Sequence, residues 1–160
     1  MKTLRGKVAA VTGAASGLGR AMANAFAAEG MHVALADVDL QNLFQVEKEI
    51  RSRGVRALSM QVDVSKAAEV DAFSEKAISE FGSVHLVCNN AGVSPLGAVW
   101  ESTLADWQWI LGVNLWGVIH GVRAFAPRLI AQNEGHIVNT ASVAGLISPP
   151  GMGAYNVTKH

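Results

Sequence analysis

Short, mostly apolar runs alternate with amphipathic stretches along this chain. The runs are typical of strands that are buried on both faces of a sheet, and we place them at residues 8–11, 31–36, 55–62, 84–88 and 136–140. The stretches between them carry apolar residues at helical spacing and predict helices at residues 20–29, 40–53, 65–80 and from 102 or 103 to about 132. Strands that alternate with helices predict βαβ units, and therefore a parallel α/β sheet in a single domain over residues 1–160.

Polar residues and glycines mark the ends of these predicted helices. Asp39 is the expected N-cap of the second helix and Ser65 of the third, because short polar side chains can accept a hydrogen bond from a free N–H of the first turn. Either Ser102 or Thr103 is expected to cap the last and longest helix. Gly54 is placed to end the second helix.

Composition narrows the class of protein. Thirteen Lys and Arg balance thirteen Asp and Glu, so the charge does not point to nucleic acid or an acidic membrane as a partner. The mean hydropathy is +0.25, yet no apolar run is long enough to span a bilayer, and Gly6 and Lys7 interrupt the start before a signal-peptide core. The single Cys88 excludes an internal disulfide and fits a reducing compartment, so we expect a cytoplasmic protein.

A glycine-rich turn lies between the first strand and the first helix. Its glycines are spaced Gly13-x3-Gly17-x-Gly19, which differs from the more general G-x-G-x-x-G fingerprint. Such glycines permit a tight turn and close backbone approach, and a helix N-terminus offers free N–H groups to a pyrophosphate. A purely structural turn is the alternative, but the position directly after the first strand favours a phosphate site.

Asp37 ends the second predicted strand, 18 residues after Gly19. A carboxylate at that position can accept hydrogen bonds from an adenosine ribose and would repel a 2′-phosphate. Neither Val38-Asp39 nor residues 14–16 supply a Lys or Arg, so the pattern favours NAD over NADP. The alternative is a solvated helix-capping aspartate, a role that suits Asp39 better.

Ser142, Tyr155 and Lys159 form a candidate acid–base site near the end of the chain. If a helix starts near Met152, Tyr155 and Lys159 lie on one face, about one turn apart. An unperturbed tyrosine has a pKa near ~10 and is a poor base at neutral pH, but a fixed cation beside it favours the phenolate. Ser142 could then hold a substrate oxygen beside the phenol.

Five motifs in register resemble the short-chain dehydrogenase/reductase family over residues 7–159. They are Thr12-Gly13-x3-Gly17-x-Gly19, Asn89-Asn90-Ala91-Gly92, Asn114, Ser142 and Tyr155-x3-Lys159. The resemblance implies a Rossmann-type, doubly wound fold with helices on both faces, a nicotinamide cofactor, and oxidation of an alcohol or reduction of a carbonyl. It also implies a homo-oligomer in which the long helix packs against its equivalent in a second subunit.

The resemblance assigns roles to individual residues. The catalytic set would be Asn114, Ser142, Tyr155 and Lys159. Asp63 would contact the adenine through its side chain and Val64 through its backbone, and Asn114 would bend its helix and hold a water near Lys159. The cofactor-binding set would be Thr12, Gly13, Ser16, Gly17, Leu18, Gly19, Asp37, Asp63, Val64, Asn90, Ala91, Gly92, Tyr155 and Lys159.

Members of this family continue well past the position of Lys159, so we expect five strands here with the C-terminal part of the fold missing. The fifth strand would then present an open apolar edge. A chain that stops at His160 is expected to bind cofactor poorly and to turn nothing over. The alternative to an active oxidoreductase is therefore a catalytically inactive, nucleotide-binding remnant.

Other conspicuous residues have less specific interpretations. Cys88 lies in an apolar strand and is expected to be a buried, inert thiol. The histidines at positions 32, 85, 120, 136 and 160 show no metal-ligand spacing, so no metal site is predicted. Residues 94–97 and 145–153 are expected to contribute walls to a substrate pocket. Trp100 is a candidate for its border, with core packing or a subunit face as the alternatives.

Overall fold

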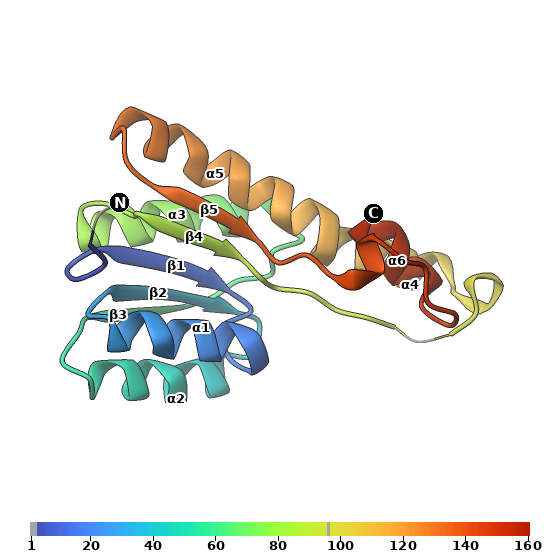
Figure 1. Ribbon diagram of the computed structural model, residues 1–160, viewed down its shortest axis with the longest axis horizontal. Coiled ribbons are helices and arrows are strands. Elements are labelled where there is room, and N and C mark those ends of the chain that lie inside the picture. The colour runs from blue at the N-terminus through green and yellow to red at the C-terminus, as the bar shows by residue number, and fades with distance from the viewer. Residues whose placement is uncertain (1–2, 96) are drawn as a thin grey trace.

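A five-stranded parallel sheet forms the body of the protein (Figure 1). In the computed structural model, which describes residues 3–95 and 97–160, the strands are β1 (Val8–Thr12), β2 (His32–Asp37), β3 (Ala57–Gln61), β4 (Leu86–Asn89) and β5 (His136–Asn139). Their order is β3-β2-β1-β4-β5, so the chain starts at the centre and winds outward to both sides. This is the doubly wound topology that the family resemblance implies.

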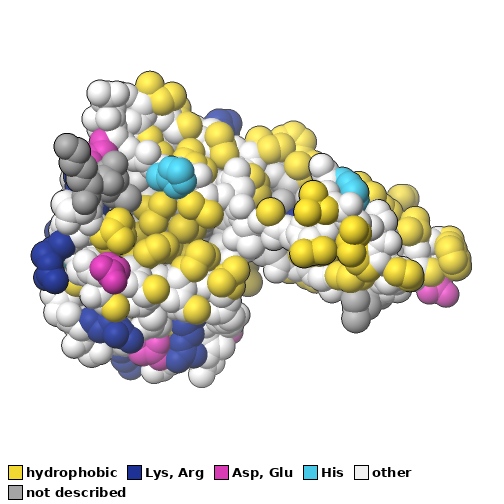
Figure 2. Space-filling view, viewed as in Figure 1, with side chains coloured by type: hydrophobic (Ala, Val, Ile, Leu, Met, Phe, Trp, Pro, Cys, Tyr) yellow, Lys and Arg dark blue, Asp and Glu magenta, His cyan; other side chains and the backbone are white. Residues whose placement is uncertain are grey.

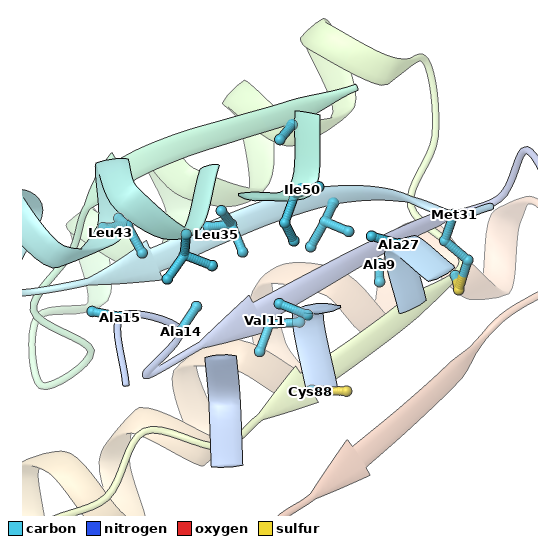
Figure 3. Close-up of a cluster of buried hydrophobic side chains, with 14 of the residues drawn as sticks. Ala9, Val11, Ala14, Ala15, Ala27, Met31, Leu35, Leu43, Ile50 and Cys88 are labelled. Carbon is cyan, nitrogen blue, oxygen red and sulfur yellow. The ribbon is translucent and has the colours of Figure 1, made fainter. Parts of the chain in front are cut away.

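Helices cover both faces of the sheet. On one face lie α1 (Gly17–Ala28) and α2 (Leu40–Arg51), and on the other lie α3 (Ala67–Phe81) and α5 (Gly117–Ala131) (Figure 1). Each pair encloses its own apolar core. Figure 3 shows the first, where small and branched side chains of β1, β2 and α2 interdigitate. In the second, the rings of Phe73 and Phe125 meet edge to face with centroids 6.0 Å apart.

Two of the predicted helix caps are confirmed and one is wrong. Asp39 accepts a hydrogen bond from Asn42 N at the start of α2, and Thr103 forms a reciprocal capping box with Asp106 at the start of α4 (Leu104–Leu111). Ser65 does not cap α3, which begins after Lys66. Its N–H and hydroxyl instead both donate to Asp63 Oδ1, at 3.0 and 2.7 Å, because the turn before the helix uses the serine to fix that carboxylate.

The long helix predicted up to residue 132 is three segments rather than one. A π-helical turn, Gly112–Trp116, separates α4 from α5. The turn lies against the segment after β3: a Cβ on Gly112 would stand 3.1 Å from Ser65 Cβ, and one on Gly117 would stand 2.7 Å from Val64 Cγ2. The glycines thus let the helix approach closely, and the π turn places Asn114 in the interior.

Segments that follow β4 and β5 extend beyond the carboxyl ends of the strands (Figure 1). They carry two 3₁₀ turns, Val99–Glu101 and Val143–Gly145, and α6 (Gly153–Lys159), and an isolated bridge joins Gly97 to Met152. Apolar side chains gather on this extension and over part of the sheet body (Figure 2).

The strand β5 lies at one edge of the sheet, and its Val138 is 36% exposed, in line with the apolar edge predicted for the fifth strand. Across residues 3–95 and 97–160, no helix has both the length and the apolar character that crossing a bilayer requires.

Candidate active site

A cavity of about 670 Å³ opens at the carboxyl ends of the central strands. It brings together segments from the glycine turn, the ends of β2, β3 and β4, the helix α4 and the helix α6. Of the residues predicted to hold a cofactor, those that line the cavity are Gly13, Ser16, Gly17, Leu18, Gly19, Asp37, Asp63, Val64, Asn90, Ala91, Gly92, Tyr155 and Lys159. Residues from the beginning and the end of the chain therefore face one space.

Each of the three positions in the turn requires glycine for a different structural reason. Gly13 has φ +65°, and a Cβ there would stand 2.8 Å from Ala91 Cα. A Cβ on Gly19 would stand 2.0 Å from Gly13 O, so only glycine lets α1 start this close to the end of β1. Gly17 has φ +50°, and a Cβ there would meet no atom within 4 Å, so its open side faces the cavity. Gly13 and Gly19 allow the close backbone contacts of the turn, and Gly17 leaves open space beside the turn.

The N-terminus of α1 offers uncapped backbone donors to this cavity. Ser16 is the N-cap residue, but its side chain accepts no bond from the first turn, and no acidic residue lies there. Ser16, Gly17, Leu18 and Gly19 all line the cavity. An anion placed at this point would find free N–H groups and the positive end of the helix dipole.

Thr12 is the one predicted cofactor residue that does not line the cavity. It is buried, and its hydroxyl donates to Cys88 O at 3.3 Å. The same oxygen accepts hydrogen bonds from Asn90 N at 3.0 Å and Ala91 N at 3.1 Å. Thr12 thus ties the end of β1 to the segment after β4 and supports the residues that face the cavity.

Asp37 lies half-buried at the end of β2, on the rim of the cavity. Its Oδ2 accepts from Ala15 N at 2.9 Å, and its Oδ1 accepts from Asp39 N at 3.0 Å, so the carboxylate has a fixed orientation. Among the described residues that line the cavity, Lys159 is the one Lys or Arg, and it comes from α6. No lysine or arginine side chain among the lining residues therefore comes from the rim near Asp37.

Asp63 belongs to a tightly bonded segment at the end of β3. Burial raises the pKa of its carboxyl, but hydrogen bonds from Ser65 and the nearby Lys66 ammonium outweigh burial and hold that pKa below its usual value. Its own N–H donates to Glu69 Oε2 at 2.7 Å. The Asp63 carboxylate is thus charged and oriented at neutral pH, at the wall of the cavity.

Tyr155 and Lys159 lie one helical turn apart on α6, as predicted, and both face the cavity. Lys159 Nζ stands 5.7 Å from the centroid of the Tyr155 ring and donates to Thr140 O at 2.9 Å. The lysine backbone is packed closely as well, because a Cβ on Gly145 would stand 2.1 Å from Lys159 O. The bond to Thr140 thus holds the ammonium beside the phenol ring, and Gly145 packs against the backbone of the same lysine.

Asn114 and Ser142, the other two residues of the predicted catalytic set, do not line the cavity. The buried Asn114 amide bonds both backbone groups of Val93: its Oδ1 accepts from Val93 N at 2.8 Å and its Nδ2 donates to Val93 O at 2.9 Å. Nδ2 also donates to Thr158 Oγ1 at 3.1 Å, which links the π turn to α6. The Ser142 hydroxyl accepts from Ala144 N at 3.2 Å.

Sequence reasoning missed the contribution of α4 to the cavity. Gln108 and Trp109 of α4 line it together with Val113 of the π turn, and Trp109 is 49% exposed. The concentration of tryptophans in this segment was a signal, but it pointed to Trp100, which is 86% exposed and lines a separate cleft with residues 148–151 and 153. Of the expected pocket walls, Ser94 lines the main cavity and Gly97 the second cleft, while Leu96 lies outside the described residues.

The interpretation of Cys88 as a buried, inert thiol is supported by its surroundings. It is 1% exposed, and burial raises the pKa of the thiol to about 11. Within the described part of the chain, no group of three His, Cys, Asp or Glu side chains is arranged to hold a metal ion.

The chain as a whole resembles known proteins. A family model described as short chain dehydrogenase matches residues 7–160, and the chain belongs to that family. The Mycobacterium tuberculosis protein SadH is 41% identical over 159 residues, which cover 99% of this chain and 58% of SadH. The chain thus spans somewhat more than half the length of this relative.

Solved structures repeat the fold closely. A crystal structure of a short-chain dehydrogenase/reductase from Burkholderia phymatum, in complex with NAD, matches with a TM-score of 0.97 at 52% identity, covering 100% of this chain and 57% of that one. A metagenomic short-chain oxidoreductase in complex with NADP matches with a TM-score of 0.93 at 36% identity, covering 98% of this chain and 71% of that one.

Proposed function

We propose that this protein is an oxidoreductase that transfers a hydride between NAD and an alcohol or carbonyl substrate. The observation that supports it most is that Tyr155 and Lys159 line the same cavity as the glycine turn and Asp37. A dinucleotide held along that cavity would have its phosphates at the turn, its adenosine toward Asp37 and its nicotinamide toward α6. The activity belongs to the family, and its assignment to these residues is our inference.

The residues present fit a dinucleotide. Gly17 leaves open space beside uncapped N–H groups, where a side chain would stand in the way of a pyrophosphate. Asp37 would accept from the ribose hydroxyls, and its charge, without a lining cation nearby, would repel a 2′-phosphate. We therefore infer NAD rather than NADP, although solved relatives include proteins bound to either cofactor.

In this proposal Tyr155 is the general acid and base. As phenolate it takes the proton of the substrate alcohol, and as phenol it returns that proton in the reverse direction. Lys159 Nζ stands 5.7 Å from the centroid of the Tyr155 ring, and its bond to Thr140 O keeps the ammonium in position beside the phenol. Ser142 would orient the substrate oxygen. NAD, when bound, supplies the hydride acceptor.

Replacing the Tyr155 hydroxyl tests this assignment. We expect Tyr155→Phe to abolish NAD-dependent oxidation of secondary alcohols, followed as absorbance of the reduced nicotinamide, while NAD affinity measured by calorimetry changes little. Val157→Ala is the matched control, because Val157 lies on the same helix, is 59% exposed and does not line the cavity. Measurable turnover by the unsubstituted protein that Tyr155→Phe retains would refute the role of the phenol.

The alternative function is a nucleotide-binding protein without turnover. It shares the glycine turn, Asp37 and Asp63 with the first proposal and differs only in whether Tyr155 performs chemistry. Binding of NAD without any change in nicotinamide absorbance, across a panel of secondary alcohols and ketones, would favour the alternative. Cytoplasm remains our expected location for either function.

We also propose that the protein forms a homo-oligomer through the end of the π turn and the start of α5. Leu115, Trp116 and Ile119 are large apolar residues at 42%, 52% and 40% exposure on adjoining turns. Burying them against a second copy would remove apolar surface from water. Light scattering with Trp116→Glu tests this, since the charge should shift the mass toward that of one chain.

A further inference from the structure

We propose that His120 is a positioning residue for nucleotide binding, which acts by holding the backbone of Val64 at the cavity wall. The inference rests on the proposed dinucleotide site and deepens it. His120 lies on α5, outside the cavity, and belongs to none of the motifs that identify the family. Its side chain is buried, and its Nδ1 stands 2.9 Å from Val64 O.

The segment from Asp63 to Ser65 is the part of the cavity that His120 controls. Its backbone is fixed at Asp63 N by the Glu69 carboxylate and at Ser65 N by Asp63 Oδ1. Among the described residues, Val64 N–H has no acceptor, and Val64 lines the cavity. A nucleotide base that carries an acceptor would take a hydrogen bond from this donor.

The hydrogen bond to His120 can run in only one direction. A carbonyl oxygen only accepts, so His120 Nδ1 must carry a hydrogen and donate to Val64 O. This fixes the hydrogen-bonded nitrogen of the ring, and it also fixes the peptide that follows Val64. Loss of the donor would leave the Val64 carbonyl without its partner and release this peptide from α5.

Gly117 packs against the side chain of the same residue, Val64. A Cβ on Gly117 would stand 2.7 Å from Val64 Cγ2 and 3.1 Å from Val64 Cβ, so the helix touches Val64 directly. Gly117 and His120 are three residues apart and therefore lie on one face of α5. Gly117 thus contacts the side chain of Val64, and His120 bonds its carbonyl. The Val64 N–H remains as the group that is available to a ligand.

The ring of His120 also contacts Trp116, with centroids 5.8 Å apart. A substitution at position 120 therefore removes packing as well as a hydrogen bond, and the test must separate the two. Asparagine and glutamine do so, because the amide nitrogen of asparagine occupies the position of Nδ1 and that of glutamine occupies the position of Nε2. Both are polar and both replace the ring.

The experiment compares His120→Asn and His120→Gln with the unsubstituted protein by calorimetry, using ADP-ribose and nicotinamide mononucleotide as probes. We expect His120→Gln to bind ADP-ribose about five- to tenfold more weakly, the effect of one neutral hydrogen bond. His120→Asn should stay within about twofold, and the mononucleotide, which has no adenine, should bind all three proteins alike. A melting temperature for each variant reports on packing.

Two outcomes overturn the inference while the proposed function stands. One is unchanged ADP-ribose affinity in His120→Gln, and the other is equal weakening in both variants, which would assign the effect to the lost ring. If the unsubstituted protein binds neither NAD nor ADP-ribose, the proposed function itself fails and the inference with it.

A measurement on the unsubstituted protein applies where His120→Gln does not fold. Nitrogen NMR should show hydrogen on His120 Nδ1, and the Val64 amide proton should shift and exchange more slowly when ADP-ribose is added. A Val64 amide that does not respond would refute the role of His120.

Discussion

The open side of Gly17 makes a sharp prediction about the glycine turn. Replacing Gly17 by alanine places a methyl group where no protein atom lies within 4 Å, at a backbone φ of +50°. Gly54 offers a matched control, because it has φ +81° and equally open surroundings but lies after α2, away from the cavity. The two substitutions therefore share the backbone strain, and only one adds a side chain at the proposed phosphate site.

The strain can be estimated for both positions. A left-handed conformation costs an L-residue about 1–2 kcal/mol, and the lower entropy of the unfolded alanine chain returns roughly 0.4–1 kcal/mol. A net loss near ~1 kcal/mol should lower the melting temperature of a protein of this size by about 2–4 °C. The melting temperatures of Gly17→Ala and Gly54→Ala should fall by similar amounts.

The affinities should differ where the melting temperatures do not. At Gly17 the methyl group would separate a pyrophosphate from at least one backbone N–H, and a hydrogen bond to a charged group is worth about 1.5–3 kcal/mol. That loss corresponds to roughly 10- to 100-fold weaker ADP-ribose binding, measured by calorimetry. Gly54→Ala should bind as the unsubstituted protein does.

One result would refute this reasoning. Suppose that Gly17→Ala has the same melting temperature as Gly54→Ala and still binds ADP-ribose at the original affinity. The phosphates then do not approach the turn at Gly17. The assignment of the cavity to a dinucleotide would then need a different orientation.

Three further predictions concern charge. Asp37→Asn removes the charge that we expect to exclude a 2′-phosphate, so the ratio of KM for NADP to KM for NAD should fall by about tenfold, or ~1.4 kcal/mol; an unchanged ratio would contradict the role of Asp37. Cys88, with its pKa raised to about 11, should resist iodoacetamide at pH 8 and react only after unfolding, as mass spectrometry can show. The hydrogen bond from Lys7 lowers the pKa of Glu134 below its ordinary 4.5. Because the folded pKa is the depressed one, the stabilisation is complete above about pH 4.5 and lost as pH falls through the lower value. Acid unfolding of Glu134→Gln should therefore be less steep over that interval.

Local sequence patterns predicted the parts of the fold that depend on local chemistry. The run Val8–Val11 followed by glycines could be interpreted as strand and turn, and Tyr155 and Lys159 share a face because four residues make about one helical turn. The Asp39 cap was predictable for the same reason, since its partner Asn42 is three residues away.

The errors arose where contacts with residues outside the predicted helix decide its bounds. Ser65 has the composition of a cap, but Asp63 competes for its donors, and α3 starts later. The break between α4 and α5 follows from the close approach of Gly112 and Gly117 to residues 64 and 65, which no helical pattern encodes. Trp109 lines the cavity from α4, on the other side of that break.

The π turn at Gly112–Trp116 also sets a phase relation between two helices. A π turn holds more residues than the 3.6 of an α turn, so it offsets the faces of α4 and α5 relative to one continuous helix. Upstream of it, Gln108 and Trp109 face the cavity; downstream, Gly117 and His120 face Val64. Deleting one residue from the turn would rotate one helix by about 100° against the other. A change in the length of residues 112–116 should therefore disturb both faces at once, which a substitution at one of these positions would not do.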